Sequence, residues 1–179
     1  MPITPLHMGP GILLKALLRG SFSLMVFGYA NVLIDLQPLI ALESGHGEVH
    51  GWTHTWWAAV AIGAFAAVTG KWLADLALWF VASDDRPRLR VKWWIAALSA
   101  YLGTLSHIAL DSIVHSDMRP FAPWSDAHPW LGLVSPSAVD EWCVIAGVVG
   151  TALYFVGTLV SRRRTTASAR KHVSNSSRT

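Results

Sequence analysis

Four long apolar stretches run along the chain, and polar or charged segments separate them. They cover residues 22–42, 52–81, 93–114 and 139–160. Each approaches or exceeds the ~20 residues that an α-helix needs to cross a bilayer. A shorter apolar segment before Gly20 predicts an additional helix. The pattern therefore predicts an all-α protein, a polytopic membrane helical bundle of about four transmembrane helices plus a short N-terminal helix.

The second stretch is too long for one straight span. Gly70, Lys71 and Asp75 interrupt its apolar run. We therefore expect the helix to leave the membrane near Gly70 and to continue along the interface, where Trp72 and Trp79 would lie.

The composition supports a membrane protein. Hydrophobic residues make up 53% of the chain and charged residues only 14%, whereas a soluble domain is about 25% charged. The single cysteine, Cys143, lies inside an apolar stretch and excludes an internal disulfide framework.

Lysine and arginine concentrate in two segments, which sets the expected orientation. One segment covers residues 84–92, between the second and third stretches, and the other follows the fourth stretch. The positive-inside rule places both in the cytoplasm and the other two connecting loops outside. We expect a membrane-embedded domain over 1–161 and a basic, disordered cytoplasmic tail over 162–179. Because topology accounts for the basic tail, we expect no nucleic-acid partner.

Six of the eight histidines fall in or beside the two outer loops: His46, His50, His54, His107, His115 and His128. His7 requires a geometric argument. His7 lies about 13 residues before Gly20, and Asp35 lies about 15 residues after it. If the chain turns at Gly20 into an antiparallel helical hairpin, the two arms have similar lengths, so Asp35 returns to the level of His7. A surface helix with a cytoplasmic N-terminus fits the charges equally well.

The spacing of the polar groups predicts where they meet. His107 and Asp111 are four residues apart, so they share one face of a helix. His50 and His54 have the same spacing, although His50 is expected just before the helix starts, and Asp35 lies inside the first span. Imidazole and carboxylate groups suit zinc, manganese or iron. Asp35, His54, His107 and Asp111 are therefore expected to meet a little below the outer membrane surface, around a divalent metal.

Each of these signals also has a simpler explanation. A histidine near a helix end is often an interfacial residue, and a His-x-x-x-Asp pair often stabilises a helix by a hydrogen bond. Asp35 alone fits a polar helix-packing group, although ionisable residues inside spans usually have a function. Convergence of several ligand-type residues on one side of three spans favours the metal site.

Four motifs occur in order along the chain: "TPLHMG", "LIDLQP", "HGWTHT" and "SHIALDSIVHSDMRPFAPWS". Together they resemble the family of membrane-bound, metal-dependent hydrolases described as LexA-binding and inner-membrane-associated. The resemblance implies a location in the inner (plasma) membrane. It also implies a set of metal-site residues: His7, Asp35, His50, His54, His107 and Asp111.

The chain departs from the family pattern at three positions. Gln37 stands where the family has a second aspartate, and Ile34 stands in place of a proline. The arginine of the third motif is replaced by Trp52 or is missing, depending on the alignment. The first change reduces the expected metal count or weakens a second ion, and the third removes a phosphate-binding cation.

The leading hypothesis is a membrane-embedded, metal-dependent hydrolase, and a phosphoester of a lipid is the most plausible substrate. Asp35 or Asp117 would accept a proton from the attacking water. His115 and Asp117 would support the metal ligands, and Arg119 is the cation available for an anionic substrate, although an interfacial anchor explains it as well. The alternatives are a metal or proton transporter, a metal-binding protein without chemistry, haem ligation by a histidine pair, and histidines that only line the interface.

Overall fold

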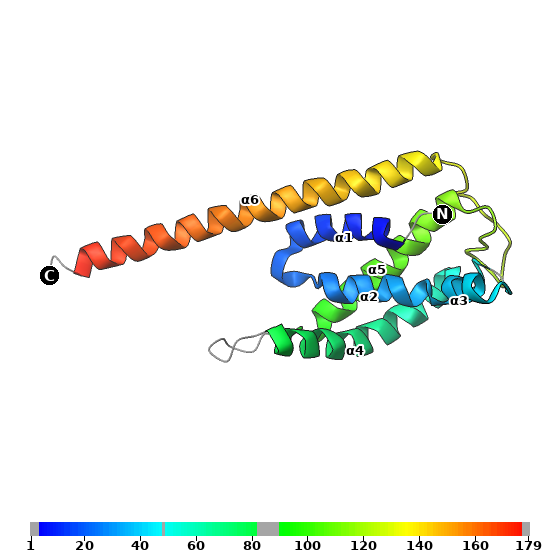
Figure 1. The fold of residues 1–179 in the computed structure, drawn as a ribbon, viewed down its shortest axis with the longest axis horizontal. Helices are drawn as coiled ribbons and strands as arrows, with labels where there is room; N and C mark the ends of the chain where they lie inside the picture. Colours follow the sequence, from blue (N-terminus) through cyan, green and yellow to red (C-terminus); the bar gives the residue numbers. More distant parts are fainter. Residues whose placement is uncertain (1–3, 48, 82–89, 177–179) are drawn as a thin grey trace.

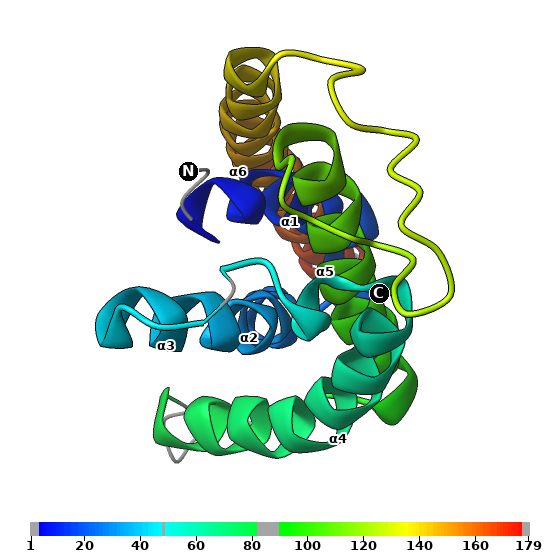
Figure 2. The same cartoon turned by 90° about the vertical axis from the view of Figure 1, so that its right-hand side faces the viewer.

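The computed structural model describes residues 4–47, 49–81 and 90–176, and these residues contain helices and no strand. Figure 1 labels the helices, and Figure 2 gives a second view. The helices are α1 (Thr4–Leu18), α2 (Leu24–Ile34), α3 (Leu36–Ser44), α4 (Trp56–Val81), α5 (Trp93–Val114) and α6 (Pro136–Ser176), with short 3₁₀ helices η1 (Arg19–Ser21) and η2 (Trp52–His54). This confirms the all-α fold with a short N-terminal helix.

The membrane-spanning capacity of the described residues also agrees with the prediction. Helices α4 and α5 and the Pro136–Ser161 part of α6 are long and apolar enough to cross a bilayer. The bent pair α2–α3 makes a fourth span if its two helices count as one. Helices α2, α4 and α5 pack together, and α1 packs mainly on α6.

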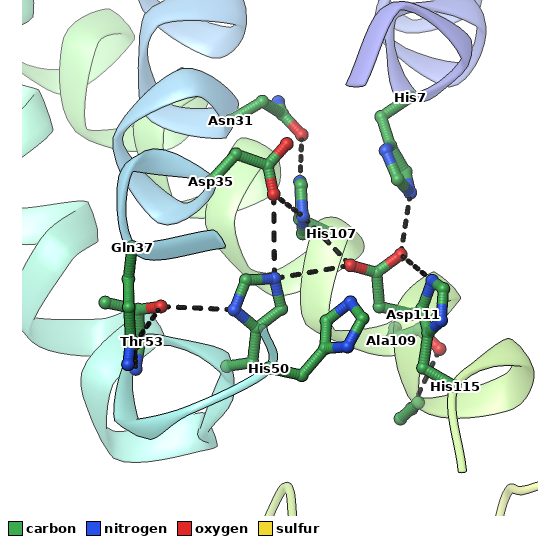
Figure 3. A network of polar contacts seen from close by, with 12 residues as sticks. His7, Asn31, Asp35, Gln37, His50, Thr53, His107, Ala109, Asp111 and His115 are labelled. Atoms are coloured by element: carbon green, nitrogen blue, oxygen red, sulfur yellow. Dashed lines mark hydrogen bonds and ion pairs between the residues drawn. The ribbon is translucent and has the colours of Figure 1, made fainter. Parts of the chain in front are cut away.

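The first predicted span is broken at Asp35. Helices α2 and α3 differ in direction by 42° across this residue. Pro38 explains the break, because proline has no N–H to donate to the carbonyl of Ile34 and its ring crowds that carbonyl. The backbone resumes its hydrogen bonding where Leu39 N donates to Asp35 O. The bend sets Asp35 at a helix junction, where its side chain faces the neighbouring helix α5 (Figure 3).

Helix α4 passes through Gly70 without a break. A Cβ atom at Gly70 would lie 3.0 Å from the ring of Tyr29, so glycine allows α4 to approach α2. Lys71 is buried, and its Nζ lies 2.7 Å from Asp75 Oδ2. Asp75 also accepts a hydrogen bond from the backbone N–H of Val91. Gly70 is therefore packed against α2, Lys71 and Asp75 pair within α4, and the exit from the membrane near Gly70 stays a prediction.

Glycines bring α1 and α6 into close contact. A Cβ atom at Gly9 would overlap the backbone carbonyl of Cys143, and one at Gly150 would lie 2.6 Å from Leu13 Cα. Small residues at such positions let two membrane helices approach until their backbones touch. This contact fixes the position of α1, and with it the position of His7.

Helix α6 differs from the sequence prediction at its C-terminal end. Its backbone stays helical to Ser176, where a disordered tail was expected from residue 162 onward. Extending an existing helix costs less than starting one, and the segment contains the good helix formers alanine, arginine and lysine. In Figure 1 this extension points away from α3 and from the loop after α5. The basic end of α6 and the loops that follow α3 and α5 are therefore at opposite ends of the molecule.

Candidate metal centre

Four side chains from three parts of the chain converge at the end of the bundle near α3. Asp35 comes from the α2–α3 junction, His54 from the end of η2, and His107 and Asp111 from α5. Each offers one ligand atom, and these atoms all lie within 4.8 Å of one another. Figure 3 shows Asp35 and Asp111 on either side of the His107 ring nitrogen. We call this set the inner cluster.

The distances within the inner cluster match the spacing of ligands around one ion. His107 Nε2 lies 3.1 Å from Asp35 Oδ1 and 3.0 Å from Asp111 Oδ2. His54 Nε2 lies 3.6 Å and 3.4 Å from the same two oxygens. Ligand atoms at 2.0–2.1 Å from a tetrahedral ion are about 3.3 Å apart. The four groups are therefore spaced so that one small divalent cation can contact all of them.

Asn31 fixes the protonation pattern of His107. Its side-chain nitrogen donates to the carbonyl of Phe27 at 2.8 Å, which orients the amide so that Oδ1 faces His107. That oxygen lies 2.9 Å from His107 Nδ1. Because an amide oxygen only accepts, Nδ1 carries a proton, and in the neutral ring the lone pair is therefore on Nε2, which faces the carboxylates.

Thr53 does the same for His54. The Thr53 hydroxyl donates to Gln37 Oε1 at 2.8 Å, and the Thr53 backbone N–H donates to the same oxygen at 3.0 Å. With its own proton used, the hydroxyl oxygen accepts from His54 Nδ1 at 3.1 Å. His54 Nε2 is therefore left as a lone-pair donor as well. Gln37 supports His54 through Thr53, at the position where the resemblance implied a further acid.

These assignments make the inner cluster unfavourable without a cation. The side chains of His54 and His107 are 0% exposed and that of Asp111 is 4% exposed. Both Nε2 atoms are buried without a hydrogen-bond partner among the described residues. With both rings neutral, two lone pairs face two carboxylates in a largely buried site, and buried polar groups of this kind cost several kcal/mol unless paired. The donor set and its burial therefore fit a divalent metal ion.

His7 also reaches this end of the bundle. Its Nε2 lies 3.2 Å from Asp111 Oδ1, and its ring stacks on that of His107 with 4.4 Å between centroids. Helix α1 thus runs antiparallel to α2, as the hairpin of the sequence analysis required. His7 thus lies beside the cluster, whereas the side of the membrane on which the N-terminus lies stays a prediction.

His50 lies outside the inner cluster. It lies just before the 3₁₀ helix η2, as expected, and its ring is in edge contact with that of His54 at 5.0 Å. His50 Nδ1 lies 2.8 Å from Asp117 Oδ2, and its ring stacks on His115 at 4.1 Å. His50 and His115 form with Asp111 a second group within metal-binding distance.

Asp117 and His115 have shifted pKa values that follow from this packing. Partial burial opposes ionisation of Asp117, but the hydrogen bond from His50 outweighs it and lowers the pKa of the carboxyl group. Burial, followed by the nearby His50, lowers the pKa of His115. At neutral pH Asp117 is therefore ionised and His115 is neutral.

A family model for the YdjM inner membrane protein matches residues 14–173, and this segment includes the whole inner cluster. The chain belongs to the YdjM inner membrane protein family. His7 precedes the matched segment. No curated protein and no solved structure matches the chain.

Membership of the YdjM family agrees with the inner-membrane part of the predicted resemblance. The hydrolase activity and the LexA binding of that resemblance stay predictions, as do the orientation of the helices and the cytoplasmic position of the C-terminus. The structure adds an Asp/His cluster that could hold a metal ion.

Two buried polar residues of this YdjM family member were missed by the sequence reasoning. Asn31 is 0% exposed and Thr53 is 5% exposed. A polar residue inside the first apolar stretch was the available signal for Asn31, whereas nothing in the sequence singled out Thr53. Arg119, the cation considered for substrate binding, lies 3.7 Å from Asp126 Oδ1 at an exposed position.

Proposed function

We propose that this protein is a membrane-embedded, metal-dependent hydrolase that cleaves phosphoester bonds of lipids. The observation that carries the proposal is the inner cluster, where two lone-pair imidazoles and two carboxylates converge at 3.0–3.6 Å in a largely buried site. Donors of this type suit zinc, with manganese or iron as the other candidates, and we propose zinc.

The members of the inner cluster have different exposure, which suggests different roles. His54, His107 and Asp111 are the most deeply buried and would hold the ion, and catalytic zinc sites commonly use three protein ligands and keep one position open. Asp35 is 23% exposed and lies at the edge from which water and substrate enter. A bound divalent ion supplies a Lewis acid and a water of lowered pKa. Asp35 is placed to orient that water and accept its proton.

A lipid substrate is supported by an apolar cavity beside the cluster. This cavity, of about 550 Å³, lies between the bent pair α2–α3 and helix α4. Leu33, Ile40 and Phe65 are among its lining residues, and so are Gln37 and Thr53, the pair that supports His54. An acyl chain would pack against these apolar residues, and the headgroup of the lipid would then lie close to the metal ligands. The site would act on the outer leaflet of the inner membrane if the positive-inside orientation is correct.

The proposal is tested on detergent-purified protein prepared without chelator. Zinc content by mass spectrometry is compared between wild type and the His107→Ala/Asp111→Ala double variant, with His128→Ala as the matched control. His128 is a half-buried histidine that contacts the carbonyl of Ser112 and belongs to no metal-binding group. We expect zinc in the wild type and the control, and its loss in the double variant with the helical circular-dichroism signal retained.

Hydrolysis is then measured with phospholipid vesicles and a chromogenic phosphodiester. Asp35→Asn should keep the zinc and reduce kcat by about 10²–10⁴-fold, since it removes a proton acceptor. Zinc-loaded wild type that hydrolyses neither substrate would contradict the proposal. Zinc uptake into proteoliposomes under those conditions would instead identify a transporter.

A further inference from the structure

The two oxygens of the Asp111 carboxylate face different sets of histidines. Oδ2 lies 3.0 Å from His107 Nε2 and 3.4 Å from His54 Nε2, within the inner cluster. Oδ1 lies 3.2 Å from His7 Nε2 and 3.9 Å from His115 Nε2. Figure 3 shows His7 and His115 meeting this second oxygen from the side away from Asp35. One buried carboxylate is therefore shared between two groups of imidazoles.

The second group has ligand geometry of its own. Asp111, His50 and His115 each offer an atom, and these atoms lie within 4.8 Å of one another. Asp117 accepts the proton of His50 Nδ1 at 2.8 Å, so Nε2 is the lone-pair nitrogen of that ring. His50 is thus oriented by a carboxylate, as metal-bound histidines usually are.

The second group surrounds a buried oxygen. Asp111 Oδ1 is approached by His7 Nε2 at 3.2 Å and by His115 Nε2 at 3.9 Å. His50 and His115 stack with their centroids 4.1 Å apart, so both rings lie beside the same carboxylate. Imidazole nitrogens gathered around one buried carboxylate oxygen are the arrangement expected of ligands that share a cation.

We propose that the site binds a second divalent cation, held by Asp111 Oδ1, His50 and His115, with His7 close enough to serve as a fourth ligand. Asp111 would then bridge two cations, one in each group. His115 becomes a metal ligand, a role that neither the family resemblance nor the inner cluster assigns to it. The inference rests on the proposed function and deepens it, because paired ions stabilise both the attacking and the leaving oxygen in phosphoester cleavage.

The test is the zinc stoichiometry of the full-length protein in detergent, loaded with excess zinc and passed through a desalting column. We expect about two zinc ions per chain in the wild type and about one in His115→Ala, because only one of the two ion positions loses a ligand. The control variant His128→Ala changes a histidine of the same loop as His115. It should keep about two zinc ions per chain, because neither ion position loses a ligand. His115→Gln preserves polarity and size and replaces the alanine variant if that variant does not fold.

Manganese provides a readout that is independent of activity. Wild type loaded with Mn²⁺ should give the electron paramagnetic resonance spectrum of an exchange-coupled pair, and His115→Ala should give that of an isolated ion. One zinc ion per chain in both proteins, with no coupled manganese spectrum, would overturn the second site. Hydrolysis by a one-zinc protein would overturn only the second site, whereas two zinc ions without hydrolysis would overturn only the proposed function.

Discussion

Replacing Asn31 with alanine tests the protonation pattern on which metal binding depends. Asn31 is fully buried, and its oxygen holds the proton of His107 on Nδ1. Without that oxygen the proton is better placed on Nε2, where Asp35 and Asp111 accept it at 3.1 Å and 3.0 Å. A metal ion must then displace this proton. Loss of such a supporting contact lowers metal affinity by about 10–100-fold, which is about 1.4–2.7 kcal/mol.

The assay is a competition titration of zinc between the purified protein and a chelator of known affinity. Ser99→Ala is the control, because Ser99 is equally buried and accepts a hydrogen bond from Ser23 N at 2.8 Å away from the metal residues. Both variants should lose about 1–3 kcal/mol of stability through the loss of a buried hydrogen bond, but only Asn31→Ala should bind zinc more weakly. Equal zinc affinity in folded Asn31→Ala and wild type would refute the tautomer argument.

Two further predictions concern the packing of the bundle. Gly9→Val should destabilise the protein by about 1–3 kcal/mol, because the new side chain overlaps the backbone of Cys143. Gly20→Ala, with no neighbour within 4 Å, should leave the melting temperature unchanged, and equal melting of the two variants would contradict the close contact of α1 and α6. Lys71→Met should cost about 3 kcal/mol in detergent unfolding by leaving Asp75 without its cation, and adding Asp75→Asn should recover part of the loss. A double variant that only sums the two single losses would show that the pair is not coupled.

Local patterns were sufficient to predict much of this fold. Apolar length identified the spans, and the i and i+4 spacing of His107 and Asp111 placed both on one face of α5, where they lie 3.0 Å apart. Asp35 was identifiable because an acid inside a span is expensive unless it has a partner. These inferences needed only the helical repeat and the cost of burying charge.

The remaining features depend on contacts between distant parts of the chain. Pro38 indicates an interruption of this helix, but the sequence cannot show the 42° change of direction between α2 and α3, because that bend depends on how the Ile34 carbonyl and Pro38 are accommodated. The pairing of His107 with Asn31 joins residues 76 positions apart, and the pairing of His50 with Asp117 joins residues 67 apart. Residue type alone does not specify such partners.

The contact between α1 and α6 determines when the site can be completed during synthesis. Helix α1 is made first, but at 15 residues it is shorter than a typical membrane span, and its main packing partner is the last helix of the chain. His7 therefore takes its place beside Asp111 only after the ribosome has delivered α6 and the two helices have docked. A nascent chain that ends after α5 already carries the inner cluster but lacks the partner that holds His7. Closure of the site is thus coupled to the synthesis and docking of α6.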